Sequence, residues 1–365
     1  MRRVALAAGV LAACAALNAC RPADAAKTIR IDSAELAKRE QRLAQALGTP
    51  DSGTGRALAD PVTADSTAAD STAADSTAVV ASSSTTANVA DDKGKKDEKK
   101  DDKGKEKNDG RSESDSLVND GALARWILPR DLDEISGITL TSDGRLLAHG
   151  DERAQISEID YRRGIITKQF VVGRPTIKAD IEGIASVNGT VFLLASNGTL
   201  YEFREGENGQ RVDYITSDTH LGKECEFEGL AYDPAINSML LACKNVELKQ
   251  TADSMVIYRW KLQGGGQRLS KLAVPLDRIL PAIGEKELHP SDITVDPRTG
   301  NYVIVASIEE AIVEITPAGE VVFARKLAGQ HNQPESIAIT KDGILIIGDE
   351  AGRRPAVITL YRWPQ

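Results

Sequence analysis

The sequence predicts an all-β fold, a β-propeller of five four-stranded blades, behind a long N-terminal tether. Three observations lead to this prediction. A strand-start motif occurs five times from residue 122 onward, each copy is followed by a turn and a second apolar strand, and the chain ends one strand short of a complete last unit. Four strands per unit, at a period of roughly 40–50 residues, is typical of propellers.

The five strand starts read ISGIT, DIEGIA, EFEGLA, PSDIT and PESIA. Their anchor residues are Ile138, Ile184, Leu230, Ile293 and Ile337, at spacings of 46, 46, 63 and 44 residues. Each start leads into a turn of the Asp-Gly, Asn-Gly or Asp-Pro kind, which favours a hairpin. The second strands are almost wholly apolar, as expected for strands covered on both faces, and span Leu146–His149, Val191–Ala195, Met239–Cys243, Tyr302–Ala306 and Ile344–Gly348.

A third and a fourth strand follow in most units. The third strands are expected at Ile156–Asp160, Leu200–Phe203, Val256–Trp260, Ala311–Ile315 and Thr359–Trp363. The fourth strands are expected at Ile165–Val172, Arg211–Ile215, Leu269–Leu276 and Glu320–Leu327. The fifth unit has none, and Ala124–Leu128 is predicted to complete it and close the ring. Six blades are the alternative, with a degenerate blade hidden in 261–289, but only one clear strand is found there.

The N-terminus has the pattern of a secretion signal. Two arginines precede a short apolar run, which is too short for a spanning helix. The run ends at LNAC, which resembles a bacterial lipobox, so we expect a signal peptide over 1–19 and lipidation of Cys20. Cys14 is the alternative site, and an ordinary cleaved signal is the alternative leader. Arg21 after the cysteine favours the outer membrane, with the head in the periplasm or at the cell surface.

Residues 20–121 are expected to form a disordered tether. ADSTA repeats and a run of alternating lysines and acids cannot bury enough apolar area to offset the entropy of ordering. A solvated linker is favoured there over a basic membrane patch. Ser33–Leu47 has a helical pattern, interpreted as a transient helix within the tether. The propeller domain is expected over 122–365.

Two cysteines fall inside the predicted third unit. Cys225 precedes its first strand and Cys243 ends its second, so a hairpin folded near Pro234 places them opposite each other. We expect a disulfide in an oxidising compartment. Two buried reduced cysteines are the alternative, and no histidine or further cysteine supports a metal site.

Acidic residues recur at the strand starts. The innermost strands of a propeller line its channel, so equivalent positions form a ring at one mouth. The predicted metal ligands are Glu182, Glu228, Glu335 and Asp292. The acids just upstream, Glu134, Asp180 and Glu226, are predicted to contact a ligand, and a pocket for a cationic or polyhydroxylated ligand is the other functional interpretation of the ring. Converging carboxylates repel unless a cation or hydrogen-bond donors satisfy them, and oxygen ligands suit Ca²⁺. The alternative is structural, in which each acid accepts backbone N–H groups from the neighbouring blade.

A second set of polar residues follows the second strands. It is predicted to line the same channel or its rim and to contact a ligand, with solvated turn residues as the alternative. Its members are Asp151, Glu152, Asn197, Lys244, Glu309, Asp349 and Glu350.

Composition and motifs exclude several functions. A net charge of -9 and 4% aromatic residues argue against nucleic-acid binding. The chain has no GxSxG, HExxH or P-loop motif, and its four histidines are scattered without an evident partner. We expect a monomer.

The order ISGIT with DER, DIEGIA, EFEGLAYDP, PSDITVDP and PESIAI with DE resembles the SdiA-regulated family of bacterial propellers over about residues 124–363. The resemblance implies a secreted or lipid-anchored propeller that binds Ca²⁺. The chain departs from the family pattern at Asn197, Lys244, Asp292 and Ser336.

Two function classes remain. The first is a membrane-tethered module that binds a small ligand, a glycan or a protein at the channel mouth. The second is a metal-dependent hydrolase of the lactonase, esterase or phytase-like kind, which would use the same acids with Ca²⁺. The lack of catalytic motifs favours the binding module, with no catalytic residue assigned.

Overall fold

The computed structural model describes residues 28–29, 33–47, 80–81, 121–247, 249–262 and 268–364. The predicted lipidation site Cys20, the alternative Cys14, the signal peptide and most of the tether lie outside these residues. Of the residues described, none forms a helix long and apolar enough to cross a membrane.

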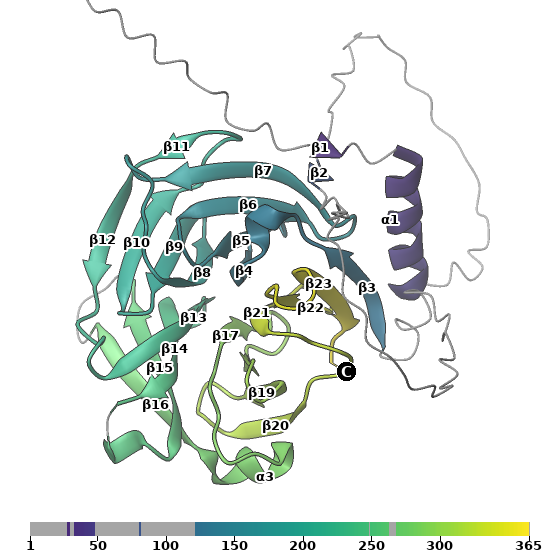
Figure 1. Cartoon of the computed structure of the whole chain (residues 1–365). Helices are drawn as coiled ribbons and strands as arrows, with labels where there is room; N and C mark the ends of the chain where they lie inside the picture. The colour runs from purple at the N-terminus through teal and green to yellow at the C-terminus, as the bar shows by residue number, and fades with distance from the viewer. Residues whose placement is uncertain are drawn as a thin grey trace, which may run out of the picture.

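Five antiparallel sheets are arranged round a central axis, which confirms the prediction of a five-bladed propeller (Figure 1). Blade one contains β4 (Ile135–Leu140), β5 (Leu146–Gly150), β6 (Gln155–Asp160) and β7 (Ile165–Val172). Blade two contains β8 (Ile181–Val187), β9 (Thr190–Ala195), β10 (Thr199–Arg204) and β12 (Tyr214–Asp218). Blade three contains β13 (Cys225–Asp233), β14 (Ser238–Val246), β15 (Ser254–Lys261) and β16 (Leu269–Pro275).

Blade four contains β17 (Asp292–Val295), β18 (Tyr302–Ala306), β19 (Ala311–Ile315) and β20 (Val321–Lys326). Blade five contains β21 (Pro334–Ile339), β22 (Ile344–Asp349) and β23 (Val357–Arg362), and is completed by the N-terminal strand β3 (Ala122–Ile127). Pairing of β3 with β23 closes the ring as the sequence predicts. The innermost strands contact one another in the order β4, β8, β13, β17, β21 and back to β4, so five blades complete the circle.

The structure corrects the predicted fourth strand of blade two. The segment Arg211–Ile215 is divided: β11 (Arg211–Val212) adds in parallel to β7 of blade one, and β12 adds to β10 of blade two. The two blades are therefore joined at their outer edges. Part of the extra length of the third unit holds short helical turns, η3 (Leu276–Arg278) and α3 (Leu280–Ile283), rather than a sixth blade. The remaining short elements are β1 (Thr28–Ile29) paired with β2 (Val80–Ala81), and the turns η1 (Arg130–Leu132) and η2 (Lys249–Thr251).

The hydrophobic core consists of five clusters, and each lies between two neighbouring blades. The second strands contribute to both sides, which is why they are almost wholly apolar. In β18, for example, Val303 and Val305 pack toward blade five whereas Ile304 and Ala306 pack toward blade three. Burial of alternate side chains against two different blades therefore fixes the register and the order of the blades.

Turn aspartates add polar links between blades. The hydroxyl of Tyr302 in blade four donates to Oδ2 of Asp233 in blade three at 2.6 Å. The indole Nε1 of Trp363 in blade five donates to Oδ2 of Asp296 in blade four at 2.8 Å. All four side chains are buried, so these bonds hold the turns against the next blade.

Helix α1 (Ser33–Leu47) docks on the outside of blade five, beside β3 (Figure 1). Leu43 is 2% exposed and joins the core cluster between blades five and one. The Arg39 guanidinium lies 5.1 Å from the centre of the Trp126 ring, and Glu40 pairs with Arg163 at 3.0 Å. The helix thus bridges the outer parts of blades five and one.

Candidate functional site

The repeated strand-start residue occupies a β-bulge in four of the five blades. The ladders between the first and second strands skip one residue each time, and the residues skipped are Ser136, Glu182, Glu228 and Glu335. A bulge leaves its extra residue unpaired and redirects the side chain. Blade four is the exception, because β17 begins only at Asp292, directly after Ser291.

The glycine that follows Glu182 and the glycine that follows Glu228 are required by close packing between blades. A Cβ on Gly183 would lie 2.7 Å from Cβ of Leu230, and one on Gly229 would lie 2.8 Å from Cα of Asp292. Contacts this short to backbone and Cβ atoms leave no room for a side chain. The Glu-Gly pair therefore combines a redirected carboxylate with the closest approach of two innermost strands.

Glu182 and Glu228 are neighbouring acids on blades two and three, and both have a raised pKa. Burial and the nearby Glu228 carboxylate raise the pKa of Glu182 to about 9, although Ser136 Oγ donates to its Oε2 at 2.9 Å. Burial raises the pKa of Glu228 to about 7, against the opposing effect of Lys244. Glu182 is therefore protonated near neutral pH, and Glu228 is close to its midpoint.

Lys244 is a cation within the acid ring. Its Nζ lies 3.0 Å from Oε1 of Glu228, whose side chain is only 8% exposed. Lys244 is also attracted by Glu335 and Glu226, and these interactions raise its pKa against the effect of burial. Asn245 donates to Oε2 of Glu226 beside it. The ring thus already accommodates one ammonium group.

The acids of blades five and one continue the ring. Burial, followed by Glu335, Asp151 and Glu134, raises the pKa of Glu350 to about 7. The carboxylate of Asp151 is the main cause of a raised pKa at Glu134. Among the residues with described surroundings, Asp151 Oδ1 is a buried oxygen without a hydrogen-bond partner. A polar cavity of about 340 Å³ is lined by Glu134, Asp151 and Glu152. In blade two, Asp180 contributes further repulsion at Glu182.

Asp292 has the structural role that the sequence left open. It is 1% exposed, and its two carboxylate oxygens accept the amides of Ile293 at 2.8 Å and Ile337 at 2.9 Å. Burial raises its pKa well above the ordinary value. Because Ile337 belongs to blade five, Asp292 links two innermost strands at a position where blades one to three have glycine.

The remaining candidates at the ends of the second strands are occupied by local bonds. Glu309 bonds His289 Nδ1 at 2.7 Å, and Asp349 bonds His331 Nδ1 at 2.9 Å. Both acids are buried, and each pair fastens the segment before an innermost strand. Asn197 Oδ1 accepts the amide of Thr199, as a turn residue does.

The sequence analysis did not predict the β-bulges, and it did not predict that these two histidines bond to acids. His289 and His331 each lie a few residues before a strand start, and their acids lie at or shortly after the end of the second strand of the same unit. Aligning the units on those two positions would have paired them. His331 also meets the hydroxyl of Tyr361 at 2.9 Å from its Nε2, which places three polar groups in the core of blade five.

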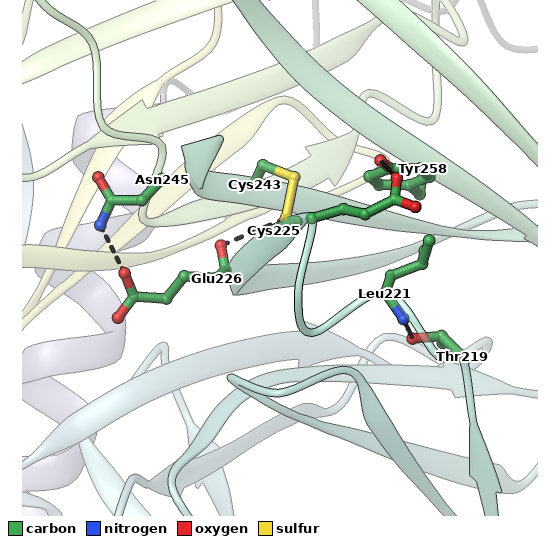
Figure 2. The surroundings of a disulfide bond; sticks show 8 residues. Thr219, Leu221, Cys225, Glu226, Cys243, Asn245 and Tyr258 are labelled. Carbon is green, nitrogen blue, oxygen red and sulfur yellow. Dashed lines mark hydrogen bonds between the residues drawn. A yellow bond between two sulfur atoms is a disulfide. The ribbon is translucent and has the colours of Figure 1, made fainter. Parts of the chain in front are cut away.

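The third unit contains a disulfide between Cys225 and Cys243, with Cα atoms 5.6 Å apart (Figure 2). It joins the start of β13 to β14, next to the Glu226–Asn245 bond. Within the ranges that the structure describes, no group of three or more His, Cys, Asp or Glu side chains is arranged to hold a metal ion.

The fold and this site define the chain as a five-bladed β-propeller with an acidic channel mouth. The family model described as SdiA-regulated matches residues 269–362, from β16 to β23, and confirms the resemblance of the strand-start motifs to that family. A search of curated proteins finds no match.

Similar solved structures include three enzymes. Myxococcus xanthus glutaminyl cyclase is 13% identical at a TM-score of 0.45, over 66% of this chain and 94% of that chain. Catalytically inactive virginiamycin B lyase from Staphylococcus aureus, with quinupristin, is 17% identical at 0.37, over 66% and 74%. Luciferin-regenerating enzyme is 8% identical at 0.42, over 66% and 96%. At these scores we transfer no activity to this chain.

Proposed function

We propose that this chain is a lipid-anchored, extracytoplasmic binding module whose acidic channel mouth takes a cationic ligand. The observation that supports the proposal most directly is electrostatic. Carboxyl groups from blades one, two, three and five interact at one mouth, and burial together with their repulsion raises the pKa of Glu182 to about 9 and of Glu350 to about 7. A bound cation would relieve this repulsion, so the fold maintains a site that is incomplete without positive charge.

An ammonium or guanidinium group fits the mouth better than a bare metal ion. Lys244 pairs with Glu228 at 3.0 Å and is attracted by Glu226 and Glu335, which supports a preference for an ammonium group there. The part of the chain that is described has no set of three metal-ligating side chains. Ca²⁺ remains a prediction of the sequence, and the same experiment tests it.

The anchor and the location belong to the same proposal. A lipidated Cys20 would hold the head at the membrane through the tether, and the Cys225–Cys243 disulfide is consistent with an oxidising compartment. Incorporation of labelled palmitate into the wild-type chain, and its loss in Cys20→Ser but not in Cys14→Ser, would test the anchor.

Thermal melting with added cations tests the site. We expect spermidine or agmatine to raise the melting temperature of the wild-type head more than NaCl of equal ionic strength, and CaCl₂ and MgCl₂ are tested in parallel. Glu182→Gln/Glu228→Gln should abolish the shift. The matched control is Glu207→Gln/Glu320→Gln, which makes the same two exchanges at exposed positions. Equal shifts in both double variants would contradict the proposal.

A hydrolase is the second candidate, and one observation favours it. Neighbouring carboxyls with pKa values of about 9 and about 7 provide a proton donor and a base, as in acid–base catalysis. A panel of ester, lactone and phosphate substrates, with and without Ca²⁺, tests this candidate. Turnover that is lost in Glu228→Gln would favour it over the binding module.

A further inference from the structure

The opposite end of the channel holds a second and larger cavity, of about 730 Å³. Its walls are the later residues of the innermost strands, and its rim is formed by turns between first and second strands. The bulged acids occupy the beginnings of those same strands. The cavity is therefore separate from the acidic mouth, and none of the acids assigned to that mouth lines it.

Small side chains keep this part of the channel open. The residue after each anchor is a threonine or an alanine in all five units, and the copies that line the cavity are Thr139, Ala231, Thr294 and Ala338. Ala185 holds the same position in β8. A ring of leucines there would fill the axis with side chains, as happens in tightly packed barrels. The repeat thus preserves a space of ligand size.

The walls are mostly apolar and carry a hydrogen-bonding group without a partner. Ile138, Leu230 and Ile293 line the cavity and are at most 3% exposed. Ser186 also lines it, and among the described residues its Oγ is a buried oxygen with no hydrogen-bond partner. A buried hydroxyl left unpaired is costly, and a turn of the Ser186 side chain that brings its Oγ to the cavity surface would let a ligand bond to it and gain both affinity and orientation.

The rim adds little net charge. Arg162 pairs with Asp342 at 3.0 Å, and Asp143 pairs with Arg145 at 2.8 Å. Lys341 donates to the carbonyl oxygen of Ser142. This end of the channel therefore differs from the acidic mouth, where like charges face one another, and it does not select a charged ligand.

We propose that this cavity is a binding site for an uncharged, mainly apolar small molecule whose polar group hydrogen-bonds Ser186. A volume of this size, with apolar strand residues in the walls and most of the polar side chains gathered in the rim turns, has features of small-molecule sites. The proposal does not depend on the cation site, because no assigned cation-binding residue contributes to the cavity.

The test uses N-phenyl-1-naphthylamine, an uncharged probe that fluoresces in apolar surroundings and carries one N–H group. We expect the wild-type chain to bind it saturably. Thr139→Leu/Thr294→Leu fills the cavity from blades one and four and should weaken binding at least about tenfold, as a blocked apolar site does. Ser186→Ala should weaken it about two- to tenfold, the effect of one lost hydrogen bond.

Two controls separate this site from others. Thr190→Leu makes the same exchange in a smaller cavity of about 240 Å³ between blades two and three, and should leave probe binding unchanged. Glu182→Gln/Glu228→Gln should also leave it unchanged. If the double threonine variant fails to fold, probe binding is compared instead in the single variants Thr139→Leu and Ser186→Ala. Absence of saturable binding in the wild type, or equal binding in folded cavity variants, would overturn the proposal.

Discussion

Lys244 and Glu228 are both extra residues in the β13–β14 ladder, and they pair with each other at 3.0 Å. The register skips Glu228 on one strand and Lys244 on the other, so two adjacent bulges redirect opposite charges toward one another. The ion pair is thus a product of backbone geometry, and it places an ammonium within a ring of acids.

Removing the ammonium should destabilise the propeller. Lys244→Met leaves the buried Glu228 without its partner, and we expect a loss of about 1–3 kcal/mol in the free energy of unfolding near pH 8, below the cost for a fully buried pair. Adding Glu228→Gln to Lys244→Met should recover most of the loss. Urea unfolding of the four members of this double-mutant cycle measures the coupling, and additive effects would contradict it.

Stability should fall as pH rises from about 5 to about 9. The folded pKa values of Glu182, Glu228 and Glu350 are raised to about 9, 7 and 7 from 4.5, so in this range the folded state holds protons that the unfolded chain has released. Between its unfolded and folded pKa values, each group lowers the free energy of unfolding by at most about 1.4 kcal/mol for every pH unit. The effect of Glu350 is smaller, because this side chain is partly exposed and solvent screens the repulsion. Urea unfolding against pH should give a flatter profile for Glu182→Gln, and a rise toward alkaline pH would refute the assignment.

Asp292 should matter for stability and not for cation binding. The two carboxylate oxygens of Asp292 each accept a hydrogen bond from a backbone N–H group. Asp292→Asn replaces one of these oxygens with an NH₂ group, which cannot accept, so we expect a loss of about 1–3 kcal/mol in the free energy of unfolding. The shift in melting temperature that spermidine causes should be the same in Asp292→Asn as in the wild type. A selective loss of cation binding in a stable Asp292→Asn variant would instead make Asp292 part of the site.

The disulfide should stabilise blade three. It closes a loop with a sequence separation of 18, for which chain-entropy arguments give about 3 kcal/mol. Cys225→Ser/Cys243→Ser is expected to melt at a lower temperature than the wild type. Melting of the wild type with and without reductant gives a second reading, and mass spectrometry after alkylation counts free thiols. No difference on reduction, with alkylation complete, would contradict the prediction.

The sequence predicted the blades well because each carries a local signal. Apolar second strands, turn residues and the anchor spacing indicate strands without reference to contacts. The division of the fourth strand of blade two could not be predicted, because β11 pairs with a strand of another blade. Docking of α1 was also missed, since it depends on the burial of Leu43 against a surface that exists only in the folded propeller.

The candidate site was predicted in composition but not in detail. The repeat identified Glu182, Glu228 and Glu335 as a ring, yet a repeat cannot distinguish these bulged acids from Asp292, which accepts two amides. Equally, Glu309 and Asp349 look like channel residues in the sequence, whereas in the fold each is bonded to a histidine. In the sequence, the only indication of the apolar cavity is the small residue that follows each anchor residue.

The proton balance of cation binding tests the central claim most directly. At about pH 8, between the raised pKa values of Glu228 and Glu182, a bound cation should drive protons from the acid ring. Titration calorimetry with spermidine, and separately with CaCl₂, in two anionic buffers of different ionisation enthalpy measures this release. We predict proton release on binding by the wild type, and less release and weaker binding in Glu182→Gln/Glu228→Gln. Absence of binding, or binding with the same proton release in both proteins, would contradict a cation site at the acidic mouth.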